Sequence, residues 1–104
     1  MDDTDFFLTE GAVTVEEFRD SDGTAFSGAL LALWWDDRGD WEKAHEVAQD
    51  VEGPDGAWVH AYLHRKEGES GNAGYWYRRS GRATATGDLK AEWEGIVREM
   101  LGRD

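Results

Sequence analysis

Cysteine is absent from this chain of 104 residues, so neither a disulfide framework nor a thiolate metal site can form. Long apolar segments are absent as well. The longest apolar run, residues 29–35, is far shorter than the roughly 20 residues that a helix needs to cross a bilayer. Residues 1–5 include three aspartates, whereas a secretory or transit leader would be basic. We therefore expect a soluble, cytoplasmic protein with no membrane partner.

Basic residues are scarce. Lysine and arginine number 11 against 23 aspartates and glutamates, which gives a formal net charge of −12. This charge repels nucleic-acid phosphates, so no nucleic-acid partner is expected. The charge is uneven, because residues 1–59 hold 16 acids and 3 bases whereas residues 60–82 hold 2 acids and 5 bases. The basic segment is either an internal ion-pair partner for the acidic half or a site for an anionic ligand or acidic peptide.

Two short segments of the chain repeat a pattern. In residues 39–44 and again in residues 68–73, a glycine is followed by an acidic residue and, five positions after the glycine, by an alanine. The two segments are 29 residues apart. A fixed spacing in this range is typical of stacked helical hairpins. Such hairpins more often build binding surfaces than catalytic centres.

Helix signals cover most of the chain, and no strand-like alternation is convincing. Thr14 and Glu17 fit a capping box for a short helix that ends near Asp20. Five main helices are expected, over residues 25–38, 41–52, 54–67, 70–80 and 88–103. We predict one all-α domain over residues 1–104, built from an N-terminal arm (1–13), two antiparallel helical hairpins (25–52 and 54–81) and a C-terminal capping helix (88–103).

Small residues inside the paired helices resemble the tetratricopeptide repeat. Each hairpin has an alanine seven residues before its turn glycine and another five residues after it: Ala32 and Ala44, then Ala61 and Ala73. Residues 73–80 also resemble Sel1-like repeats. The period of 29 is shorter than the roughly 34 residues usual for tetratricopeptide repeats. Two units are fewer than the roughly three that such stacks need, so flanking helices or a dimer partner must cap them.

The resemblance implies a non-catalytic module that binds a peptide or protein partner. It places four residues of the second hairpin on the face that lines the groove, namely Trp58, Tyr62, Arg65 and Lys66. Arg78 and Arg79 would support the same site. An aromatic wall with a basic end could hold a peptide or its terminal carboxylate. The alternative is that Trp58 and Tyr62 pack against the preceding hairpin.

The three histidines form a second candidate site. His60 and His64 are four residues apart and share one helix face, and His45 lies on the preceding antiparallel helix. Three imidazoles are enough for zinc or another divalent metal. General acid–base chemistry is a further possibility. The structural alternative is a pair of partly buried histidines that hydrogen-bond to Tyr77 or Asn72.

Known catalytic motifs are missing, and no cofactor is expected. The chain has no phosphate loop, nucleophile elbow or dinucleotide fingerprint. Asp36 and Asp37 are adjacent, but neighbours on a helix point about 100° apart, so we expect a solvated helix end rather than an acid–base dyad. Two alternatives to peptide binding stay open. One is a small-ligand (anion or metal) binding protein or enzyme that uses His60, His64 and Arg65. The other is a structural unit that forms a homodimer.

Overall fold

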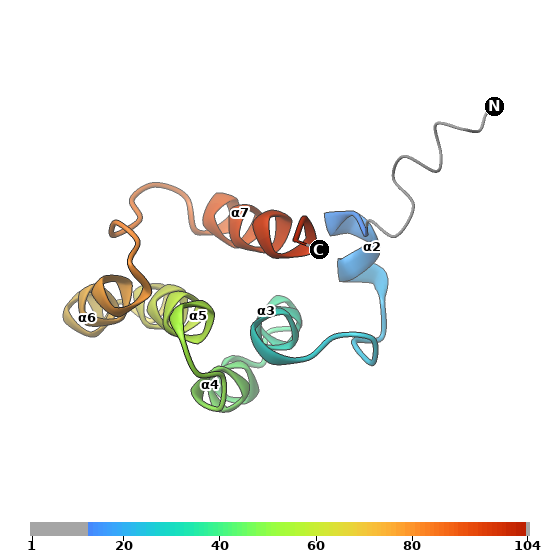
Figure 1. Cartoon of the computed structure of the whole chain (residues 1–104), viewed down its shortest axis with the longest axis horizontal. Helices are drawn as coiled ribbons and strands as arrows, with labels where there is room; N and C mark the ends of the chain where they lie inside the picture. Colours follow the sequence, from blue (N-terminus) through green and yellow to red (C-terminus); the bar gives the residue numbers. More distant parts are fainter. Residues whose placement is uncertain (1–12, 104) are drawn as a thin grey trace.

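The computed structural model describes residues 13–103, and in that range the chain forms six helices and no strand. The predicted all-α class is confirmed, and each expected helix is present (Figure 1). The predicted N-terminal arm falls almost wholly outside the described residues. The helices are α2 (Val15–Asp20), α3 (Gly28–Asp37), α4 (Trp41–Gln49), α5 (Pro54–Lys66), α6 (Ser70–Ser80) and α7 (Leu89–Leu101).

Side-chain caps fix where three of the helices begin. The predicted capping box is confirmed, because the Glu17 amide donates to the Thr14 hydroxyl and the Thr14 amide donates to the Glu17 carboxylate, both at 3.0 Å. Asp40 accepts from the amide of Lys43 and so caps α4. Asp88 caps α7 in the same way. These short-range bonds explain why the helix starts can be predicted from sequence.

The two glycine turns have nearly the same backbone conformation. Gly39 and Gly68 have φ angles of 85° and 81°, which only glycine adopts at little cost. After each glycine, the next amide donates back to the carbonyl five residues earlier, from Asp40 to Trp35 at 3.1 Å and from Glu69 to His64 at 2.9 Å. The equivalent turns close α3 onto α4 and α5 onto α6 as helical hairpins.

Three helices are clearly shorter than predicted, and one of them, α7, covers Leu89–Leu101 rather than residues 88–103. Helix α3 begins at Gly28 rather than near residue 25, because residues 23–26 form a turn in which the Phe26 amide donates to the Gly23 carbonyl. Helix α4 ends at Gln49 rather than near residue 52. Its last turn gives way to a tight connection in which the Val51 carbonyl lies against Gly56, in the first turn of α5.

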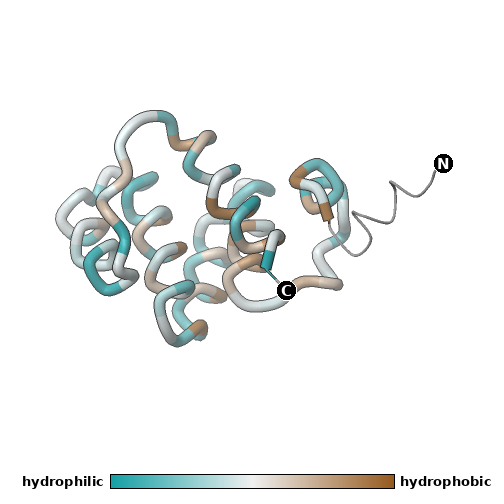
Figure 2. Tube along the Cα trace, turned by 45° about the horizontal axis from the view of Figure 1, so that its top comes forward, coloured by the Kyte–Doolittle hydropathy of each residue, from teal (hydrophilic) through white to brown (hydrophobic). Residues whose placement is uncertain are grey.

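Helix α5 is the centre of the fold. Residues 56–63 are all buried, because α5 contacts α3, α4, α6 and α7. In Figure 1, α7 lies on one side of α3 and α5, and α4 lies on the other side. Figure 2 shows hydrophobic and hydrophilic residues interspersed along the helices, as expected for helices that each bury part of their surface. None of the described helices is long and apolar enough to span a bilayer.

Candidate metal centre

Helix α7 covers the face on which the peptide groove was predicted. Trp58 and Tyr62 lie in the hydrophobic core and are only 9% and 3% exposed. The Arg82 guanidinium lies 3.5 Å from the centroid of the Trp58 ring, and the Tyr62 hydroxyl donates to Asp36 at 2.8 Å. The alternative prediction, packing against the preceding hairpin, fits Tyr62, which contacts Asp36 of α3. Trp58 instead packs against Arg82, which follows α6. Little of either aromatic surface is exposed to a peptide.

The two basic residues of the predicted groove are paired with carboxylates. Arg65 lies 2.6 Å from Glu92 of α7. Lys66 lies 2.8 Å from Asp36, which is 4% exposed. The expectation that Asp36 is a solvated helix end was therefore wrong, because the packing of α3 against α5 encloses it. Arg65 points toward α7, so it does not join His60 and His64 in one site.

Arg78 and Arg79 are exposed on α6. Arg79 lies against two aromatic rings, 5.6 Å from the Tyr75 centroid and 5.4 Å from the Trp76 centroid. Its guanidinium also donates to the Tyr75 hydroxyl at 3.2 Å. Within residues 13–103, neither arginine forms an ion pair with a carboxylate. Arg79 lines the cleft described below, whereas Arg78 does not.

The three histidines meet on the side of α5 that faces α4. One nitrogen from each ring lies within 4.8 Å of the others. The His60 and His64 rings are stacked, with centroids 5.0 Å apart and planes 13° apart. His45 stands nearly perpendicular to both, at 4.6 Å and 5.2 Å. The spacing of His60 and His64 and the antiparallel direction of α4 predicted that the three histidines lie close together, and this prediction is confirmed.

Hydrogen bonds orient two of the three imidazoles. The His64 Nδ1 lies 2.6 Å from a carboxylate oxygen of Glu69. A carboxylate at Nδ1 favours the imidazole tautomer that offers Nε2 to a metal ion, as in many carboxylate–histidine–metal arrangements. The His45 Nδ1 lies 3.2 Å from the Gln49 amide. Because the oxygen and nitrogen of an amide interchange by a flip, Gln49 can hold His45 in the same tautomer.

His60 has no hydrogen-bond partner among residues 13–103, although it is only 7% exposed. Burial, followed by the neighbouring His45 and His64, lowers its pKa from 6.5 to about 4. It is therefore neutral near pH 7, which is the form that binds metals. The predicted hydrogen bonds from these histidines to Tyr77 or Asn72 were wrong. The Tyr77 hydroxyl instead donates to Glu92.

Two tryptophans enclose the histidine cluster. Trp76 stacks on His60 with centroids 4.1 Å apart and planes 5° apart. Trp41 stacks on His45 at 4.9 Å and 11°, and its indole nitrogen donates to the Leu63 carbonyl at 2.9 Å. Sequence reasoning missed both residues, although Trp41 stands four residues before His45 and so shares its helix face.

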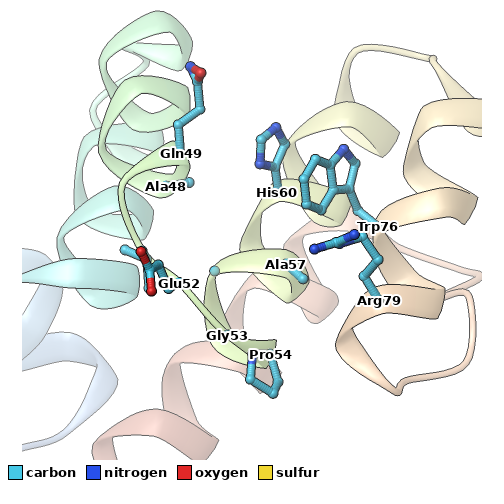
Figure 3. Close-up of a pocket in the computed structure, with 11 residues that line it drawn as sticks. Ala48, Gln49, Glu52, Gly53, Pro54, Ala57, His60, Trp76 and Arg79 are labelled. Atoms are coloured by element: carbon cyan, nitrogen blue, oxygen red, sulfur yellow. The ribbon is translucent and has the colours of Figure 1, made fainter.

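A cleft of about 650 Å³ lies beside His60 (Figure 3). The end of α4, the connection after it and the first turns of α5 form one part of the cleft, and α6 contributes Trp76 and Arg79. Figure 3 shows Gln49 and Glu52 across the cleft from His60, Trp76 and Arg79. The cleft thus connects one histidine of the cluster with solvent and with an arginine.

Comparisons of this chain with protein-family models, with curated proteins and with solved structures find no match. The interpretation of the site therefore depends on its own geometry.

Proposed function

We propose that this protein binds one divalent transition-metal ion through His45, His60 and His64. The observation that carries the proposal is the convergence of three imidazoles, one of which is buried without a hydrogen-bond partner in the described part of the chain. A buried polar group without a partner costs free energy. A metal ion would satisfy the free nitrogen of His60 and offset that cost.

The nitrogens converge but are not yet at the spacing of a bound metal ion. Two nitrogens that are each about 2.1 Å from a tetrahedral Zn²⁺ lie about 3.4 Å apart. The ligand atoms here lie within 4.8 Å of one another, so binding would draw them together by up to about 1.4 Å. His45 is only partly buried, so rotation of its side chain on α4 can bring its nitrogen closer to those of His60 and His64.

The donor set favours zinc, copper, nickel or cobalt over magnesium or calcium, because imidazole nitrogen suits the former ions and the latter prefer oxygen. Structural zinc sites in proteins usually have four protein ligands, whereas three ligands leave one position for water or another molecule. Three histidines next to an open cleft match the second pattern. The chain's net charge of −12 also attracts cations.

Peptide binding, predicted from the helical repeats, has less support than metal binding. Four of its six residues pack or pair inside the protein, and the face that was expected to be open is covered by α7. The three histidines, in contrast, lie together on the opposite side of α5 and have a route to solvent.

Titration of the metal-free protein with Co²⁺ tests the proposal, because a tetrahedral nitrogen site gives intense visible absorption bands. We expect saturation at one equivalent and displacement of the cobalt by zinc. His45→Ala is the first variant, since His45 is the less buried ligand on α4 and its loss should leave the fold intact by circular dichroism. Its affinity should fall by more than the about 10–100-fold that follows loss of a supporting group.

Glu46→Gln is the matched control, because Glu46 is exposed on the same helix, next to His45. It removes a negative charge near the site without removing a ligand, so its affinity should stay near that of the wild type. If wild type and the His45→Ala/His60→Ala/His64→Ala triple variant bind Co²⁺ equally weakly, the proposal is wrong and the cluster serves only packing.

A further inference from the structure

The Arg79 guanidinium stands out in a chain with a net charge of −12. It has no carboxylate partner in residues 13–103, although most arginines there form ion pairs. Its position is set by two aromatic rings of its own helix, Tyr75 and Trp76. One N–H of this planar cation donates to the Tyr75 hydroxyl, and the others remain free for a planar anion.

The cleft brings this cation together with one histidine of the cluster, His60. His60, Trp76 and Arg79 line the same side of it (Figure 3). Trp76 lies between the other two, stacked on His60 at 4.1 Å and within 5.4 Å of the Arg79 guanidinium. The cleft volume of about 650 Å³ falls in the range of small-molecule sites.

The start of α5 and the side chain of Glu52 affect where a charged ligand can lie in the cleft. The start of α5 contributes Gly53, Pro54, Gly56 and Ala57 to its wall, and a helix N-terminus carries partial positive charge. Glu52 lies across from Arg79 and is exposed. Its charge opposes that of an anion, so an anionic group should lie on the Trp76–Arg79 side.

We propose that the cleft binds a small organic dicarboxylate, with one carboxylate on the Arg79 guanidinium and the other on the open coordination position of the histidine-bound metal ion. This inference rests on the proposed metal site. Guanidinium and carboxylate form paired, charge-assisted hydrogen bonds, and the three histidines leave one position free on the metal ion. The two attachment points together select a molecule with two anionic ends.

The test uses Co²⁺-loaded protein and succinate. Succinate that reaches the metal ion should change the visible cobalt spectrum, and uncharged succinamide should have little effect. Arg79→Ala should weaken the succinate response by about tenfold or more, with the Co²⁺ affinity unchanged. Arg78→Ala is the matched control, because Arg78 is the exposed neighbour of Arg79 that does not line the cleft.

Glu52→Gln provides a test in the opposite direction. Removal of this charge should strengthen succinate binding without a new contact. Equal succinate responses in wild type and Arg79→Ala would overturn the inference, and so would a loss of Co²⁺ binding in Arg79→Ala. The cobalt titration is done first without succinate. Its failure refutes the metal site, whereas cobalt binding without an Arg79-dependent response refutes only the dicarboxylate.

Discussion

The Tyr62 hydroxyl donates a 2.8 Å hydrogen bond to Asp36, which lies 26 residues earlier in the chain. Both residues are almost completely buried, at 3% and 4% exposure. Lys66 also contacts Asp36 at 2.8 Å, so the carboxylate is held by two donors from α5. Burial, followed by the charge of Asp36, raises the pKa of Tyr62 well above its usual value of 10. The hydroxyl therefore stays protonated and keeps donating.

Tyr62→Phe should destabilise the protein by about 1–3 kcal/mol, because it leaves a buried carboxylate short of one donor. Urea unfolding followed by circular dichroism measures the change. Tyr75→Phe is the matched control, since Tyr75 is 46% exposed and its hydroxyl contacts only Arg79 among the described residues. Equal unfolding midpoints for the two variants would show that the Tyr62–Asp36 bond contributes little.

Acid should destabilise the metal-free protein through His60. The pKa of His60 is about 4 when folded and 6.5 in its ordinary state. Above pH 6.5 both folded and unfolded chains carry a neutral imidazole, so the full stability is present. Between pH 6.5 and 4 only the unfolded chain takes up the proton, and the stability falls by up to about 3 kcal/mol. The test is to measure unfolding midpoints in a chelating buffer between pH 6.5 and 4. The midpoint should fall as the pH falls.

The charged and titratable groups around His60 come from three directions. His45 lies on α4 and His64 on α5 itself, and both lower the His60 pKa further. Arg79 on α6 and Glu52 across the cleft line the same cavity. His60→Phe keeps an aromatic ring against Trp76 and removes the titrating group. It should therefore remove most of the dependence of stability on pH between 6.5 and 4. An unchanged pH dependence in this variant would assign the acid sensitivity to other groups.

Glu69→Gln should weaken metal binding by about 10–100-fold, because the carboxylate that orients His64 is replaced by a weaker acceptor. The measurement is the same Co²⁺ titration that tests the metal site. Glu67→Gln makes the same change of charge two residues earlier, at an exposed position, and should leave the affinity near that of wild type. Equal losses in both variants would point to general electrostatic attraction rather than to the His64–Glu69 bond.

Gly56→Ala should destabilise the fold by about 2–4 kcal/mol. A Cβ atom at Gly56 would lie 1.9 Å from the Val51 carbonyl oxygen, so the connection between α4 and α5 would have to move. Gly95→Ala is the control, because a Cβ at that position in α7 meets no atom within 4 Å. It should stabilise the helix by about 1 kcal/mol. Thermal unfolding of both variants separates the clash from helix propensity.

The features predicted well from sequence depend on short-range relationships. Asp40 and Gly39 fix the start of α4 and the end of α3 through bonds to residues at most five positions away. The histidine cluster needed only the four-residue spacing of His60 and His64 and the direction of the neighbouring helix. Each of these follows from helix geometry, without knowledge of how distant segments pack.

The features that sequence reasoning missed depend on distant contacts. The Trp93 indole donates to the Leu33 carbonyl, 60 residues away, at 3.0 Å. That contact belongs to the packing of α7 over α3 and α5, which buries Tyr62 and encloses Asp36. No local sequence pattern indicates which face of a hairpin a later helix will cover. Glu69 was also missed as a partner of His64, although it lies only five residues away, because the turn geometry decides which way its carboxylate points.

Because α5 is surrounded by four other helices, it has no route to open alone. Amide hydrogen exchange along residues 56–63 should therefore require unfolding of nearly the whole chain. Two of the three histidines of the proposed metal site, His60 and His64, lie on or next to this segment. An ion bound at the proposed site would consequently leave either when the whole protein unfolds or when the partly buried His45 swings away. Its binding energy would slow exchange throughout the fold rather than at the site alone.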